Sequence, residues 1–182
     1  MENIPKYDHV PTIFSTFEHP PEFWEEYGRV IATYGFLEHT LYGAICLFSG
    51  YLNYPKEELP EKLKRRMRKS IVDSLNPLIS EFEKAIRGYP NVKLRDLELL
   101  LTKLNETVEI RNMFCHAFWG PPDSNGSTVP FYFDKSHKYF DQPVDLAYLN
   151  RTRRHVTELI NDIGILIFIN GLKLNLKTRK DG

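Results

Sequence analysis

Apolar side chains recur every three or four residues along four long stretches of this chain, a spacing typical of amphipathic helices. These stretches predict helices over about 22–50, 58–87, 93–119 and 144–172. The second helix contains Asn76-Pro77, where a kink or a break is expected because proline lacks the backbone N–H that a helix interior needs. The pattern therefore predicts that helices make up most of the fold.

The segment between the last two long helices follows a different pattern. Gly120-Pro121-Pro122 stops the third helix, and two short aromatic runs follow on either side of Asp134-Lys-Ser-His137. This pattern predicts a small β-hairpin at about 127–141, with Pro130 on an edge strand. We therefore predict an all-α fold, a four-to-five-helix up-down bundle with a small β-hairpin insertion between the last two long helices.

The domain organisation follows from these elements. With 182 residues, 42% of them hydrophobic, the chain is long enough for one ordered domain with a full core. Residues 1–21 contain several prolines and predict an extended arm, and residues 22–172 form the bundle. Residues 173–182 predict a basic, polar tail that frays.

Charge and cysteine content narrow the class of protein. The formal net charge is zero, so a polyanion would have to be bound by a local basic patch. Cys46 and Cys115 lie in apolar helical surroundings without zinc-type spacing, which predicts reduced core thiols in a cytoplasmic protein. The apolar run 163–169 is too short to span a bilayer, so we expect a buried helix segment and no membrane partner.

Two of the apolar rows each contain one charged residue. Glu38 interrupts the row of the first helix, and Arg111 interrupts that of the third. The other members of the first row are Trp24, Tyr27, Ile31, Tyr34, Leu41, Ile45 and Phe48. A charge at a core position is costly unless it is paired, so we predict that the two face each other as a buried ion pair between helices. One interpretation is a salt bridge that only fixes how the helices pack. The other gives Arg111 a chemical role as well.

Asn112 and His116 favour the chemical role. They are four residues apart, hence on one helix face, next to the row that holds Arg111. An arginine can neutralise a phosphoryl oxygen, a histidine can move a proton near neutral pH, and an asparagine can position a group. The alternative for His116 is a histidine with satisfied hydrogen bonds at the end of a core helix, where the helix dipole favours a cation.

The sequence Arg111-Asn112-Met-Phe-Cys-His116 resembles the ribonuclease motif of the HEPN superfamily (higher eukaryotes and prokaryotes nucleotide-binding). In that motif four to six residues separate the arginine and the histidine, and Glu38 resembles an acidic residue that recurs in an early helix. The resemblance implies a metal-independent endoribonuclease of the toxin or phage-defence type, with no cofactor and no metal site. It implies RNA as substrate, a homodimer with a composite site, and an antitoxin or another protein as a further partner.

By this resemblance Arg111, Asn112 and His116 would be catalytic, with Glu38 as their supporting acidic partner. His116 would act as general base or acid around the ribose 2′-hydroxyl and the leaving oxygen. Arg111 would stabilise the charge that develops on the phosphorus, and Asn112 would orient the phosphate or the histidine. The products would carry 2′,3′-cyclic phosphate and 5′-hydroxyl ends.

RNA contacts are expected from two cationic stretches, although such runs are often only solvated helix faces. The residues considered for RNA binding are Lys64, Arg65, Arg68, Arg151 and Arg154. The aromatic segment 131–140 offers rings that could stack on bases, or that pack as a hairpin over the bundle end. Two other functions stay open: a non-catalytic HEPN-like module that binds a nucleotide or a protein, and a helical interaction protein unrelated to the family.

Overall fold

The computed structural model describes residues 19–55, 58–70, 74–89 and 94–178. The arm expected at 1–21 lies outside this part of the chain except for its last three residues, and so do residues 179–182 of the expected tail. The described part contains five α-helices and one short 3₁₀ helix, and no strand. The elements are α1 (Pro21–Phe48), η1 (Tyr51–Asn53), α2 (Glu61–Ser70), α3 (Leu75–Arg87), α4 (Leu94–His116) and α5 (Leu146–Thr178).

The first helix begins and ends where its sequence predicts. Pro21 occupies its first position, where the missing N–H costs no hydrogen bond. The helix ends at Phe48, and Gly50 follows in the left-handed conformation with φ of 72°, which glycine adopts without a steric penalty.

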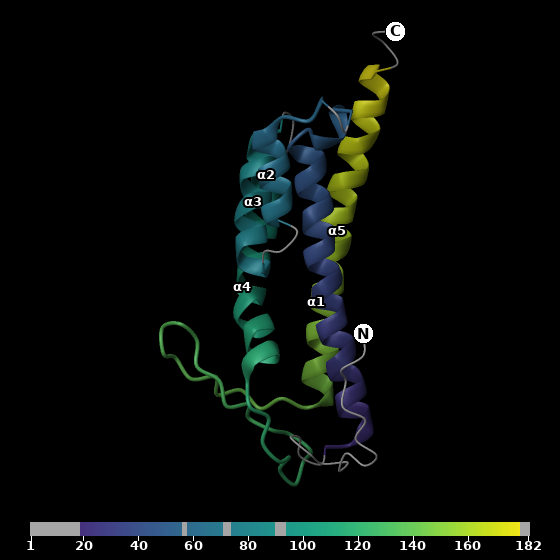
Figure 1. Ribbon diagram of the computed structural model, residues 1–182. Coiled ribbons are helices and arrows are strands. Elements are labelled where there is room, and N and C mark those ends of the chain that lie inside the picture. Colours follow the sequence, from purple (N-terminus) through teal and green to yellow (C-terminus); the bar gives the residue numbers. More distant parts are fainter. Residues whose placement is uncertain (1–18, 56–57, 71–73, 90–93, 179–182) are drawn as a thin grey trace, which may run out of the picture.

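The second predicted helix is two helices. α2 ends at Ser70 and α3 begins at Leu75, with an extended Ser74 before it at ψ of 172°. Pro77 does not mark the break itself, because it lies in the first turn of α3, where a proline is tolerated. α1, α3 and α5 run in one direction, and α2 and α4 run in the opposite direction (Figure 1).

The hydrophobic core lies along α1. Its most extensive contacts are with α5, and α3 and α4 cover its other sides. The most buried members of the core are large aliphatic and aromatic side chains from α1, α3, α4 and α5. They include Leu37, Leu41, Ile45, Leu78, Ile79, Phe82, Leu104, Phe114, Leu149, Val156 and Ile163.

The buried row of α1 shares Tyr34, Leu41, Ile45 and Phe48 with the predicted row and differs from it at other positions. Val30 and Leu37 are fully buried although the predicted row leaves them out, whereas Tyr27 and Ile31 of that row are half-buried. The reason is that α1 has neighbours on several sides, so its buried arc is wider than one row. α1 is also the one described helix that is long and apolar enough to suit a membrane span. Its place at the centre of the core accounts for the same composition.

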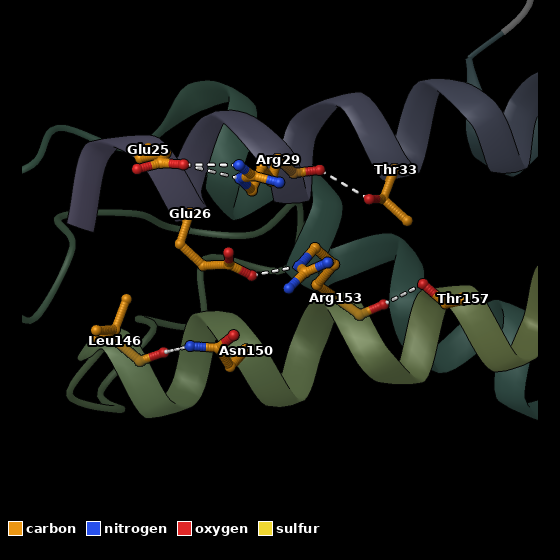
Figure 2. Close-up of polar contacts among 8 residues, drawn as sticks. All are labelled: Glu25, Glu26, Arg29, Thr33, Leu146, Asn150, Arg153 and Thr157. Carbon is orange, nitrogen blue, oxygen red and sulfur yellow. Dashed lines mark hydrogen bonds and ion pairs between the residues drawn. The ribbon is translucent and has the colours of Figure 1, made fainter. Parts of the chain in front are cut away.

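A carboxylate lies inside this buried row. Glu26 is 8% exposed and forms an ion pair with Arg153 of α5 (Figure 2). Its neighbour Glu25 is exposed and pairs with Arg29 of its own helix instead. Glu26 therefore ties the first helix to the last.

The third predicted helix ends earlier than expected, at His116 rather than about 119. Phe118 leaves the helix because its backbone pairs with that of Phe131, with N···O distances of 3.1 and 2.8 Å. The apolar row therefore changes in the last turn, where Phe114 is buried and Cys115 is exposed. The prediction of two core thiols holds for Cys46 and is wrong for Cys115.

The predicted β-hairpin is not formed as a pair of strands. Residues 117–145 make three isolated antiparallel bridges, Phe118 with Phe131, Thr128 with Val144, and Phe133 with Tyr139. This long loop lies at the end of the bundle where α4 ends and α5 begins (Figure 1). The fourth predicted helix starts there as α5, and it continues to Thr178 rather than ending at about 172.

Candidate functional site

Arg111, Asn112 and His116 line one pocket with a volume of about 380 Å³. They come from the last two turns of α4. The first turn of α3 forms a second wall with Asn76 and Pro77. The remaining lining residues are Ser74, Val108, Glu109, Tyr132 and Lys135. The structure thus brings together the three predicted catalytic residues on one concave surface.

Arg111 also makes the predicted contact with the first helix. Its Nη2 lies 3.1 Å from Oε1 of Glu38, with 19% of the Arg111 side chain and 24% of the Glu38 side chain exposed. The predicted ion pair is confirmed, although both groups are partly rather than fully buried. Glu38 Oε1 accepts no well-directed hydrogen bond, so the contact is mainly one of charge. Because a guanidinium carries five N–H donors, others remain for a ligand in the pocket.

His116 is the last residue of α4 and is exposed to solvent. Within the described part of the chain its ring has no hydrogen-bond or ion-pair partner. The alternative of a histidine at a helix end, with its hydrogen bonds made to solvent, stays open beside the catalytic interpretation. An imidazole that faces a pocket without a protein partner can exchange protons with whatever the pocket binds.

Tyr132 attaches the long loop to the same side of α4. Its hydroxyl donates a hydrogen bond of 3.3 Å to Glu109 Oε2. Burial raises the pKa of the Tyr132 phenol, and the negative charge of Glu109 raises it further, so the phenol stays protonated as a donor near neutral pH. This bond holds Tyr132, which lines the same pocket as Arg111, against α4.

Lys135 is a lining residue that the sequence did not indicate. It lies in the turn between the two aromatic runs, where its spacing resembles no motif. Its position on the pocket depends on how the loop folds back, which no local pattern records.

The five cations considered for RNA binding do not line this pocket. Lys64 forms an ion pair of 2.9 Å with Glu61, and Arg151 lies over the ring of Tyr148. Arg65, Arg68 and Arg154 are exposed. Arg153, which lies between Arg151 and Arg154 in the sequence, forms an ion pair with Glu26 (Figure 2).

The aromatic loop divides its rings between two environments. Phe131, Phe133 and Tyr139 are 40 to 59% exposed and contact one another, with ring centroids 5.3 to 6.2 Å apart. Tyr132 and Phe140 are half-buried and pack against the core. Packing over the bundle end therefore describes only part of this loop.

The pocket offers a guanidinium, an amide and an unpartnered imidazole to an anionic ligand. No group of three His, Cys, Asp or Glu side chains placed to hold a metal ion occurs among the described residues. Comparison of the chain with protein-family models, with curated proteins and with solved structures found no match.

Proposed function

We propose that this protein is an endoribonuclease that cleaves RNA without a metal ion, at the pocket of Arg111, Asn112 and His116. The observation that supports it most is that the three side chains of the motif line one pocket. The pocket volume of about 380 Å³ lies in the range of small-ligand sites. The independence from metal and the homodimer rest on the resemblance to HEPN ribonucleases.

The proposed reaction is an intramolecular transesterification, in which phosphorus exchanges its bond to the 5′ oxygen for a bond to the 2′ oxygen. A base removes the proton of the ribose 2′-hydroxyl, and that oxygen forms a bond to phosphorus while the bond from phosphorus to the 5′ oxygen breaks. An acid gives a proton to the departing 5′ oxygen, which leaves as a hydroxyl. His116 is one proton-transfer group, and in a homodimer the partner's His116 is the other. Arg111 stabilises the negative charge of the transition state, and Asn112 orients the phosphate.

The test is an RNA cleavage assay in the presence of a chelator. We expect cleavage by the wild type, and a loss of about 100-fold or more in His116→Ala and in Arg111→Ala, the usual size for a proton-transfer or charge-stabilising group. His39→Ala and Arg29→Ala are matched controls, because both side chains are exposed on α1 and lie outside the pocket. Full activity in His116→Ala, or an inactive wild type on every RNA, would refute the proposal.

Product analysis tests the proposed cleavage chemistry, and the oligomeric state tests the proposed homodimer. The products should carry 2′,3′-cyclic phosphate and 5′-hydroxyl ends, and RNA with a 2′-deoxy sugar at the cleaved position should resist. Size-exclusion chromatography with light scattering should place the activity in a dimer peak. Activity confined to a monomer peak would contradict the composite site and leave the cleavage mechanism standing.

A second candidate function is a non-catalytic HEPN-like module that binds a nucleotide or a protein. It is favoured by the contact of Arg111 with Glu38, which already compensates the arginine charge. RNA or nucleotide binding without cleavage, unaffected by His116→Ala, would support this function over the first.

A further inference from the structure

The charged groups that line the pocket differ in whether each has an ion-pair partner. Arg111 is paired with Glu38, and Glu109 keeps its negative charge while it accepts a hydrogen bond from the neutral hydroxyl of Tyr132. Lys135 has no carboxylate within 4 Å and no side-chain hydrogen bond in the described part of the chain. It is therefore the one lining residue whose full positive charge remains available to a ligand.

The turn that carries Lys135 is well ordered by its own hydrogen bonds. Asp134 Oδ1 accepts bonds from the backbone N–H of Ser136 and Lys138 and from the Ser136 hydroxyl, at 2.7 to 2.9 Å. The Ser136 hydroxyl and these N–H groups lower the pKa of Asp134, with a smaller contribution from the charge of Lys138. The Asp134 carboxylate therefore bonds to groups within the turn and lies near the charge of Lys138. It forms no ion pair with Lys135.

One contact attaches this loop to α4 beside the pocket, and bonds within the loop close the turn. Tyr132, three residues before Lys135, donates its hydroxyl to Glu109 of α4. The backbones of Phe133 and Tyr139 pair on either side of the turn, and Asp134 N–H donates to Lys138 O at 3.0 Å. A lysine on a supported turn loses less conformational freedom on binding than one on a free loop.

We propose that Lys135 binds a phosphate of the substrate in the pocket of Arg111, Asn112 and His116, as a binding rather than a catalytic residue. This inference rests on the proposed function for the nature of the substrate, an RNA strand. A lysine interacts with phosphate as a point charge, and a pocket whose arginine is already paired needs such a charge to attract an anion. Lys135 acts on substrate capture, while Arg111 and His116 act on the reacting phosphate.

The RNA arm of the test uses the His116→Ala background, which prevents cleavage, and a fluorescein-labelled single-stranded RNA 12-mer of mixed sequence. Lys135→Gln should weaken binding by about 5- to 10-fold at low salt and reduce the slope of log K against log salt by about 0.7, the value for one phosphate contact on a single strand. Lys138→Gln is the matched control, because Lys138 belongs to the same turn but does not line this pocket. Lys138→Gln should change the RNA affinity less than about twofold. Lys135→Arg keeps the positive charge and should retain most of the wild-type affinity.

Two further measurements separate this inference from the proposed function. In otherwise wild-type protein, Lys135→Gln should raise KM with little change in kcat, as expected for loss of uniform binding. Inorganic phosphate, at ionic strength matched with chloride, should raise the melting temperature of the wild type and not that of Lys135→Gln.

Each result decides one of the two proposals. If RNA is cleaved and Lys135→Gln behaves like Lys138→Gln, the inference is overturned and the function stands. If no RNA is cleaved but phosphate stabilises the protein through Lys135, the function fails and the anion site stands. If neither RNA nor phosphate depends on Lys135, the inference is overturned in either case.

Discussion

Arg111 combines two roles at the scale of a single residue. It lines the pocket, and it contacts Glu38 on the neighbouring helix at 3.1 Å. The carboxylate holds the guanidinium in place on the α1 side and leaves the remaining N–H groups for the pocket. The same pair therefore supports packing and prepares an anion-binding side chain.

A double-mutant cycle measures this pair. Glu38→Gln, Arg111→Met and the double mutant should give a coupling energy of about 1 kcal/mol from denaturant unfolding, because both side chains are only partly exposed and each leaves the other uncompensated when removed. A coupling energy of zero within error would mean that the two charges do not stabilise each other in the folded state.

Single residues differ in how far the sequence reveals their role. Arg111 and Glu38 are visible because each interrupts an apolar row, and the structure places them in contact. Glu26 interrupts no predicted row, because the buried arc of α1 is wider than the pattern suggests. Lys135 is on a turn with no periodicity, so only the folded loop brings it to the pocket.

At the scale of elements, Glu81 connects the two halves of the region predicted as one helix. Arg66 of α2 donates to Glu81 Oε2 at 2.9 Å and also to the Glu81 backbone oxygen, and Lys84 contacts Oε1 at 2.9 Å. The hydrogen bond from Lys84 and the charge of Arg66 hold the pKa of Glu81 below its ordinary value. The α2–α3 pair is thus fixed by a carboxylate that must stay ionised.

The free energy of unfolding should depend on Glu81 in a defined pH range. A carboxyl whose folded pKa is lowered stabilises the fold above its unfolded pKa, and this stabilisation is lost as the pH falls through the lower, folded pKa. Glu81→Gln should therefore cost about 1 kcal/mol at pH 7, and the difference from wild type should shrink as the pH falls below about 4.

The control for Glu81 lies on the same helix. Glu83 pairs with Arg87 and is more exposed, so Glu83→Gln should cost less than about 0.5 kcal/mol. Denaturant unfolding of both variants between pH 3 and 7, a range spanning the usual carboxyl values, checks the prediction. Equal effects of the two substitutions, or no dependence on pH, would contradict it.

The boundaries of elements were predictable where their signals are local. Pro21 and Gly50 mark the ends of α1 within two residues. The end of α4 was not predictable from the local sequence, because Phe118 pairs with Phe131 across the loop instead of continuing the helix. The break before α3 was displaced because Pro77 suits a first helical turn as well as a kink.

At the scale of the whole molecule, the periodicity was enough for the all-α class but not for the arrangement of the helices. An amphipathic row shows that a face is buried, and it does not show which helix covers it. The extra reversal between α2 and α3 places α5 beside α1 in the same direction (Figure 1). Glu26 and Arg153 join these two helices (Figure 2).

Glu26→Gln should destabilise the bundle more than Glu25→Gln. Glu26 has an 11% exposed side chain, and its loss leaves Arg153 without its carboxylate, at a cost of about 2 kcal/mol. Glu25 is 64% exposed, so its substitution should cost less than about 0.5 kcal/mol. Midpoints of urea unfolding with unchanged m-values check this difference, and similar midpoints for both variants would contradict it.

The contact of α1 with α5 also fixes an order of events during synthesis. Among the described helices the ribosome completes α1 before α5, so the side of α1 that α5 covers stays unpaired while the intervening helices are made. Contacts between such distant parts of a chain close late and slowly. Until α5 emerges, the nascent chain exposes an apolar surface that is prone to aggregation, of the kind that chaperones bind.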